Sequence, residues 1–185
     1  VKDSLNRPTD YWKTNVIGTQ RLFEHYENTR IIYASSSTAH EPWKNPYAMS
    51  KYSMEQLFHI NSLGLRFTTV YGPGARVDML IPKILRNDVQ YLNVNHIRDF
   101  IHVNDIVSAV EIMMTNTFRG VVDVGTGISN KLVDIADYFK IDYKSMIGGE
   151  TERLDNTADT SILNKFGWRA KINLYSYIEE NKNVN

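Results

Sequence analysis

The sequence predicts an α/β fold: a Rossmann-like, doubly wound parallel sheet with a small second lobe. Short apolar, β-branched segments alternate with segments whose apolar residues recur at helical spacing. Such alternation is typical of a parallel sheet flanked by helices. After about Asn87 the segments become shorter and alternate less regularly, which indicates a smaller lobe built onto the main sheet. A chain of 185 residues is long enough to bury an interior of this kind.

Each element is predicted from its apolar spacing and its end signals. Asn45 followed by Pro46 is an N-cap and first-turn pair, so a helix is expected to begin at Tyr47. Gly64 is expected to end that helix, and Asn104 to cap a later one. The expected elements are helix 14–29, strand 30–35, helix 47–62, strand 65–72, helix 77–87, strands 89–94 and 98–103, helix 105–116, strand 120–125, helix 130–140, and helices 160–165 and 174–180.

The composition indicates a globular protein and excludes several functions. Lys+Arg and Asp+Glu both number 21, so no net charge attracts nucleic acid or an anionic membrane. The absence of cysteine excludes a disulfide framework, a thiol nucleophile and a Cys-type zinc site. No apolar run approaches membrane-spanning length, and the first residues are too polar for a signal peptide. We therefore expect a cytoplasmic protein with no nucleic-acid, membrane or metal partner.

A tyrosine and a lysine four positions apart follow a run of serines. Tyr47 and Lys51 share one face of the expected helix, and an ammonium beside a phenol lowers the phenol pKa from about 10 toward that of a general base. Ser37, after the preceding strand, can donate a hydrogen bond to the same substrate oxygen. The three side chains can take a proton from an alcohol, while a cofactor must take the hydride. Such a pair also occurs by chance on surface helices, and serines at a strand end are usually turn formers.

The order of the motifs is more specific than this pair alone. The stretches are DYWKTNVIGTQRLFE, IIYASSS, NPYAMSK, LRFTTVYGPGAR, IRDFIHVNDIVSAV, VVDVGTG and ADTSILNKFGW. Together they resemble the extended short-chain dehydrogenase/reductases, in the branch of NAD-dependent nucleotide-sugar epimerases and dehydratases that includes UDP-glucose 4-epimerase. The resemblance spans nearly the whole chain. It implies that 1–88 and 98–125 form part of the NAD-binding core, and that 89–97 and 126–185 form the substrate-binding lobe.

The resemblance also implies roles for individual residues. Tyr47 is expected to be the base, Lys51 its partner, and Ser37 the third catalytic side chain. An arginine suits a diphosphate because its planar fork meets phosphate oxygens bidentately. A homodimer through helices 14–29 and 47–62 is implied as well. The expected NAD contacts are Asn15, Ser35, Tyr47, Lys51 and Phe67, and the expected contacts to the nucleotide-diphosphate sugar are Ser37, Thr69, Arg76, Arg98 and Arg153.

The chain departs from the family pattern near the expected substrate site. The loop before Tyr47 is shorter than usual, and His40 and Glu41 stand where the family has Tyr-Gly. Gly149 stands where a second phosphate-binding arginine is usual, and Arg153 lies four residues later. The expected substrate contacts therefore follow the family less closely than the Tyr/Lys pair does.

The family's Gly-rich turn, which sets a pyrophosphate on a helix N-terminus, is not in this sequence. A Gly-x-Gly does lie between a strand and a helix in VVDVGTGISN, residues 121–130, but the resemblance places that segment in the substrate lobe. The adenosine half of the NAD site is therefore expected outside these residues. The chain then belongs either to a sugar-nucleotide enzyme or to a reduced, non-catalytic module that binds a sugar nucleotide or a partner.

Within the enzyme class, epimerisation is expected rather than 4,6-dehydration. A dehydratase must also expel the C6 hydroxyl as water, which requires an additional acid. In that branch an acidic residue follows the catalytic Ser/Thr within two positions, whereas Thr38 and Ala39 follow Ser37 here. Glu41 is the nearest acidic residue.

Overall fold

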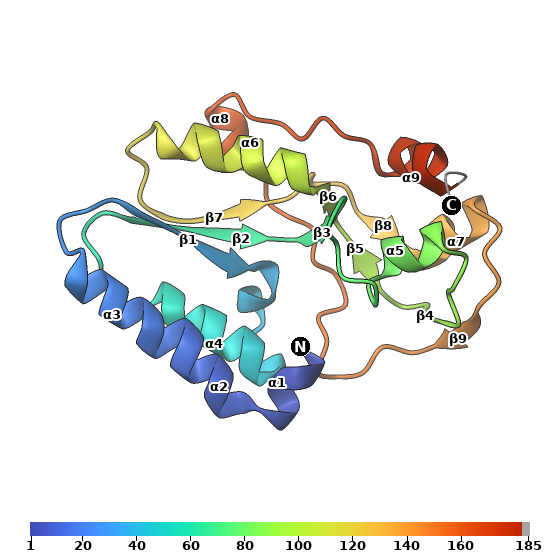
Figure 1. Cartoon of the computed structure of the whole chain (residues 1–185), viewed down its shortest axis with the longest axis horizontal. Helices are drawn as coiled ribbons and strands as arrows, with labels where there is room; N and C mark the ends of the chain where they lie inside the picture. Colours follow the sequence, from blue (N-terminus) through green and yellow to red (C-terminus); the bar gives the residue numbers. More distant parts are fainter. Residues whose placement is uncertain (183–185) are drawn as a thin grey trace.

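A computed structural model describes residues 1–182, and a three-stranded parallel sheet in the order β1–β2–β7 lies at its centre. Helices lie on both faces of this sheet, with α3 and α4 below it and α6 and α8 above it in Figure 1. This layering confirms the predicted α/β, Rossmann-like fold. The elements are β1 (Ile31–Ser36), β2 (Ser62–Phe67), β7 (Gly120–Val124), α3 (Gly18–His25), α4 (Pro46–Glu55), α6 (Val103–Met114) and α8 (Ser161–Lys165).

The first helix begins earlier and ends earlier than the predicted range of 14–29. After α1 (Lys2–Asn6), a nearly continuous helix consists of α2 (Pro8–Trp12), a π-helical turn (Lys13–Ile17) and α3. Pro8 suits the first turn because its fixed φ matches a helix start. No residue of α2 is fully buried, so apolar spacing gave no signal for it.

The helix that carries Tyr47 is shorter than predicted. Asn45 is its N-cap, as expected, since its Oδ1 accepts the Ala48 N–H at 2.8 Å. The helix ends at Glu55 rather than Ser62, because Ser62 already pairs with β1 as the first residue of β2. Gly64 does not end the helix. It lies within β2, where a Cβ atom would come within 2.8 Å of the Tyr33 ring.

The predicted strand 65–72 is in fact two strands. At Thr68 the chain leaves the central sheet, and β3 (Thr69–Tyr71) pairs with β6 (Phe100–His102). The break follows a change of hydrogen-bond partner, since Thr68 N–H donates to Val124 and Thr69 N–H donates to Asp99. His102, and not the predicted Asn104, caps α6 by accepting the Asn104 N–H.

Shorter elements build the small lobe. The exposed strand β9 was missed because its three residues show no apolar pattern. After β9 the chain returns across the molecule to α8 as an irregular segment, residues 147–160, which we call the strap (Figure 1). The small-lobe elements are β4 (Tyr91–Asn93), paired with β9 (Lys144–Met146); β5 (Ile97–Arg98), paired with β8 (Asn130–Lys131); α5 (Leu80–Leu85); α7 (Leu132–Tyr138); and α9 (Leu174–Lys182).

Two buried apolar clusters stabilise the molecule. One lies between the central sheet and α6 with α8, and includes Leu65, Met113 and Trp168. The other joins α5, α7 and α9, and includes Tyr71 and Phe100. Segments from both predicted lobes contribute to each cluster, so the division at 88, 97 and 125 stays a prediction. None of the helices among the described residues is long and apolar enough to cross a membrane.

Candidate active site

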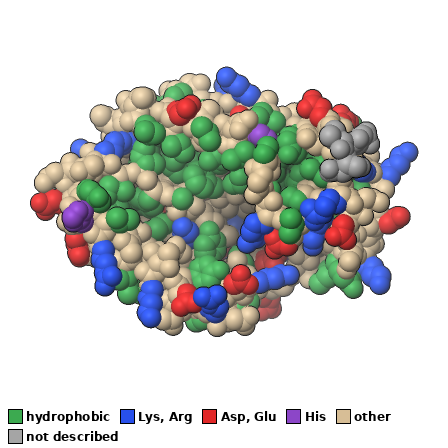
Figure 2. Space-filling view, in the orientation of Figure 1, with side chains coloured by type: hydrophobic (Ala, Val, Ile, Leu, Met, Phe, Trp, Pro, Cys, Tyr) green, Lys and Arg blue, Asp and Glu red, His purple; other side chains and the backbone are tan. Residues whose placement is uncertain are grey.

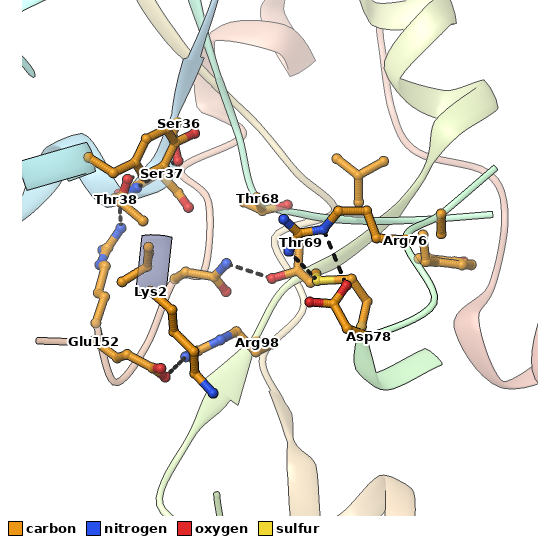
Figure 3. A pocket seen from close by; sticks show the side chains of 18 of the residues that line it. Lys2, Ser36, Ser37, Thr38, Thr68, Thr69, Arg76, Asp78, Arg98 and Glu152 are labelled. Carbon is orange, nitrogen blue, oxygen red and sulfur yellow. Dashed lines mark hydrogen bonds and ion pairs between the residues drawn. The ribbon is translucent and has the colours of Figure 1, made fainter. Parts of the chain in front are cut away.

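A cavity of about 920 Å³ opens where β1 and β2 end. The carboxyl ends of parallel strands are where open α/β sheets bind ligands, and this volume suits a small molecule. Figure 3 shows Ser36, Ser37 and Thr38 on one side of the cavity, with Arg76 and Asp78 opposite and Arg98 and Glu152 between them. Six predicted site residues line this one cavity, namely Ser37, Tyr47, Thr69, Arg76, Arg98 and Arg153.

Tyr47 lies at the wall that follows β1. The Asn45–Pro46 start of α4 places it in the first helical turn, with the Tyr11 ring edge-on at 5.8 Å. Burial raises the pKa of Tyr47, and a side-chain hydrogen bond with Ser36 works in the opposite direction. The Ser36 Oγ also accepts hydrogen bonds from the Thr38 N–H and hydroxyl, at 3.3 and 3.0 Å. Tyr47 and Ser36 thus both line this wall of the cavity.

The serine that lowers the pKa of Tyr47 is Ser36, which the sequence analysis did not single out. Ser37 lines the cavity too. Its backbone carbonyl accepts a hydrogen bond from Arg153 Nη1 at 2.7 Å. Successive side chains of a strand point to opposite faces, which separates Ser35 from Ser36; Ser37 already belongs to the 3-10 turn after β1. That alternation was the available signal: Ser35 faces the interior, where its hydroxyl donates to Glu55, and Ser36 faces the cavity.

Lys51 lies near the Tyr47 ring, and its ammonium is bonded to the strand β1. Its Nζ lies 5.9 Å from the centre of the Tyr47 ring and donates to the Ala34 carbonyl at 2.8 Å. Burial lowers the pKa of Lys51, and the nearby Glu55 works against that shift. The backbone groups of successive strand residues point to alternate edges of the strand. Those of Ile31 point toward β2, so the Ala34 carbonyl points to the other edge of β1. That edge has no partner strand among the described residues.

A charged row beneath the site holds α4 on the sheet. Ser35, Arg66 and Asp123 are neighbours across β1, β2 and β7. Arg66 donates to both oxygens of Glu55, at 2.9 and 2.6 Å, and the Glu55 side chain is fully buried. His40 contacts Asp123 at 2.9 Å. Because Ser35 also donates to Glu55, its hydroxyl is committed to this row and does not line the cavity.

The remaining predicted cofactor residues lie outside the cavity. Asn15 is in the π-helical turn, and its Nδ2 donates to Ser50 Oγ at 2.9 Å. Ser50 in turn donates to the Tyr47 carbonyl at 2.8 Å, so Asn15 supports the helix that carries Tyr47. Phe67 ends β2 beside Ser36 and packs against the cluster under α6.

The arginines opposite Tyr47 already have partners within the protein. Arg76 is largely exposed, with its Nε 3.4 Å from Asp78. Arg98 donates to the Ile97 carbonyl, makes a 2.8 Å contact with His96 Nδ1, and lies 4.0 Å from Glu152 (Figure 3). Burial lowers the pKa of Arg98, and the nearby carboxylates work against this shift.

Thr69 and Arg153 line the cavity but are also engaged. The Thr69 hydroxyl accepts from Asn156 Nδ2 at 3.0 Å. The Arg153 Nε lies 3.3 Å from Glu41, while its Nη1 donates to Ser37. Sequence reasoning placed these side chains at the site, but could not predict the partners that they hold.

The Gly-x-Gly turn after β7 is filled by the protein itself. The N–H groups of Thr126 and Gly127 donate to the Asp99 carboxylate at 2.9 and 2.8 Å. A carboxylate therefore takes the donors that a pyrophosphate would need. At this turn the described residues therefore leave these two N–H groups unavailable to a pyrophosphate.

The sequence matches the NAD dependent epimerase/dehydratase family over residues 1–125, and the chain belongs to this family. That class of protein agrees with the parallel sheet and with the Tyr47 site. Membership confirms the resemblance inferred from the motifs, and the family is NAD-dependent.

Individual relatives are similar at modest identity. Protein CapI of Staphylococcus aureus is 32% identical over 140 residues, covering 60% of this chain and 42% of CapI, so the match spans less than half of that protein. A UDP-glucose 4-epimerase of Yersinia enterocolitica is 23% identical and covers 97% of this chain and 70% of that protein. The structure of MoeE5 in complex with UDP-glucuronic acid and NAD is 26% identical, with a TM-score of 0.76, covering 91% of this chain and 69% of MoeE5.

Proposed function

We propose that this chain forms the catalytic and sugar-binding part of an NAD-dependent nucleotide-sugar epimerase that acts at carbon 4 of the sugar. The observation that carries the proposal is that Tyr47 and Ser36 line the same cavity as Arg76 and Arg98. The pair can hold a hydroxyl and accept its proton, and the arginines can hold a diphosphate.

The proton step belongs to Tyr47. Burial favours its neutral phenol in the free chain, so proton transfer requires positive charge to arrive near the hydroxyl. NAD, when bound, supplies the hydride acceptor that no side chain provides. Lys51 would break its hydrogen bond to the Ala34 carbonyl and bind the nicotinamide ribose instead, as the resemblance implies. Ser36 would keep the reacting hydroxyl against Tyr47.

The diphosphate would be held by arginines that exchange partners. Arg98 currently contacts the buried His96 and lies 4.0 Å from Glu152. A diphosphate offers more negative charge and bidentate geometry, so it competes well against a carboxylate at that distance. The nucleotide and the hexose are not encoded in these residues, and a UDP-hexose is our working substrate.

Epimerisation fits the site better than dehydration. Ser36 is followed by Ser37 and Thr38, neither of which can protonate a leaving hydroxyl. The Glu41 carboxylate is paired with Arg153 at 3.3 Å and does not line the cavity. A 4,6-dehydratase is the second candidate, and it would have to recruit one of the carboxylates that do line it, which belong to Asp3, Asp78 and Glu152.

The adenosine half of the NAD site would be supplied at the free edge of β1. That edge ends the sheet among the described residues, and hydrophobic side chains gather over α6 and the sheet beside it in Figure 2. Ile32 and Val110 are only partly buried in this region. An added strand with its Gly-rich turn would pair with the edge and cover the apolar surface. Without such a segment, the chain would act as the non-catalytic sugar-nucleotide module.

We further propose a homodimer through the helical layer formed by α2, α3 and α4. Leu22 on α3 is 53% exposed, and Met49 and Tyr52 share one face of α4 with substantial exposure. Such exposed apolar groups favour a helix-to-helix interface. Light scattering at micromolar concentration should give the mass of two chains, and a monomer would contradict the proposal.

The reaction is tested by incubating an enzyme form that has a complete NAD site with sugar nucleotides in deuterated water. Epimerisation at C4 leaves every carbon-bound hydrogen unexchanged, because the same hydride returns to the sugar. A 4,6-dehydration instead gives a 4-keto-6-deoxy sugar with solvent deuterium at C5. Mass spectrometry and NMR of the product distinguish the two, and C5 deuterium with loss of water would overturn our assignment.

A further inference from the structure

The strap connects the substrate side of the cavity to both catalytic elements. Asn45 Nδ2, at the start of the Tyr47 helix, donates to the Thr151 carbonyl of the strap at 2.9 Å. Arg153, two residues further along the strap, donates to the Ser37 carbonyl at 2.7 Å. One short stretch of the strap therefore contacts the Tyr47 helix and the turn that follows Ser36.

Asn45 uses its whole side-chain amide for this connection. Its oxygen caps α4 by accepting the Ala48 N–H at 2.8 Å, and its nitrogen reaches the strap. The residue is 6% exposed, so both hydrogen bonds are shielded from water. A movement of the strap near Thr151 is thus transmitted to the N-terminus of the helix that carries Tyr47.

Arg153 forms the second connection, and its geometry does not suit a diphosphate ligand. Its side chain is 18% exposed, and Nη1 donates to the Ser37 carbonyl. Its Nε lies 3.3 Å from Glu41 and makes no hydrogen bond among the described residues. Glu41 is also 3.7 Å from Lys44, so a second cation helps to fix its carboxylate. Arg153 and Glu41 are both departures from the family pattern, and they meet in this contact.

We propose that Arg153 is a positioning residue, which holds the turn after Ser36 at the spacing that Tyr47 requires and joins that turn to the strap. Glu152 and Asn156 of the strap line the cavity, so a ligand in the cavity presses on the segment that fixes the catalytic pair. The kinetic consequence of this inference rests on the proposed function, whereas its structural consequence can be measured on the chain alone.

The structural test is hydrogen exchange of the chain itself. In Arg153→Gln the amides of Thr38 and Glu41, which form the turn after Ser36, should exchange about tenfold faster, because a charge-assisted hydrogen bond to that turn is lost. Arg153→Lys should restore part of the protection of these amides from exchange. The double variant Glu41→Gln with Arg153→Gln should exchange only slightly faster than either single variant, because both changes break the same contact. Arg7→Gln, in an exposed ion pair, is the matched control. Unchanged exchange at Thr38 and Glu41 would overturn the proposal.

The kinetic test uses an enzyme form with a complete NAD site. Arg153→Gln should lower kcat about 10- to 100-fold with little change in KM for the sugar nucleotide. Weakening the contribution of Ser36 should also move the limb of the pH–rate profile on which the rate rises with pH to higher pH, because Ser36 lowers the pKa of Tyr47 and a base must be ionised to act. A raised KM with unchanged kcat would show that Arg153 is instead a substrate ligand. Absence of turnover by the unsubstituted enzyme would refute the proposed function, and hydrogen exchange would still decide the role of Arg153.

Discussion

The two walls of the cavity differ in how far they are prepared for a ligand. On the wall that we propose to be reactive, Tyr47 and Ser36 both line the cavity, and a helix cap and the end of a strand hold them in place. On the binding wall, Arg76 and Arg98 are engaged with groups of the protein itself. Under the proposed function, the fold already holds the reactive wall in place, while the arginines of the binding wall would exchange partners when a diphosphate binds. The expected rate of reaction depends on the first wall, and the expected affinity on the second.

The largest effect is expected from breaking the reactive wall. In an enzyme form with a complete NAD site, Tyr47→Phe removes the group that accepts the proton and should lower kcat about 10²- to 10⁴-fold. Binding of the sugar nucleotide should be largely unchanged, because the arginines are intact. Single-turnover kinetics together with calorimetry check this prediction. A variant that retains normal kcat would show that the proton goes elsewhere.

The support beneath the reactive wall should matter for stability. Glu55→Ala leaves the partly buried Arg66 without its bidentate partner, and removing one member of a buried ion pair destabilises a protein by up to about 3 to 5 kcal/mol. Urea unfolding measures the loss. Asp10→Ala, in the exposed pair with Arg7, is the control and should leave the midpoint unchanged. Equal midpoints for the two variants would contradict the buried role of Glu55.

A smaller effect is expected from breaking the binding wall. Arg98→Gln should weaken the binding of a nucleotide-diphosphate sugar about 10- to 100-fold, the worth of a charge-assisted hydrogen bond to phosphate. The kcat at saturation should change little, which sharpens the contrast with Tyr47→Phe. Unchanged affinity by calorimetry would mean that the diphosphate lies elsewhere.

The smallest effect concerns alkaline pH. Burial raises the pKa of Tyr33 to about 12, above its ordinary value of 10.0. Between these values the unfolded chain has lost the Tyr33 proton while the folded chain keeps it, so stability is full below pH 10 and falls as the pH rises toward 12. The slope should stay below about 1.4 kcal/mol per pH unit, because partial exposure screens the group. Tyr33→Phe should flatten it in urea titrations, and an unchanged slope would argue against Tyr33 as its source.

Sequence reasoning found the reactive wall because its signals are local. The Asn45–Pro46 cap, the spacing of Tyr47 and Lys51, and the adjacent serines all act within one strand and one helix. It singled out Ser37, and the structure places both Ser36 and Ser37 at the cavity, because the chain turns into a 3-10 helix directly after β1.

The binding wall was predictable by residue type and not by contact. Arg98 contacts His96 from its own strand region, but Arg153 contacts Glu41 and Ser37 more than a hundred residues away. Lys51 was likewise expected beside the Tyr47 hydroxyl, whereas the free edge of β1 offers it the Ala34 carbonyl. Such pairings depend on the tertiary packing of distant segments, which a local sequence pattern does not predict.

The most direct test of the central claim is a crystal structure of the protein with UDP-glucose. We predict a sugar hydroxyl about 3 Å from both Tyr47 Oη and Ser36 Oγ. The diphosphate should lie against Arg98, with its guanidinium turned away from Glu152. A sugar bound outside the cavity, or a diphosphate on the Thr126–Gly127 turn in place of the Asp99 carboxylate, would contradict the account.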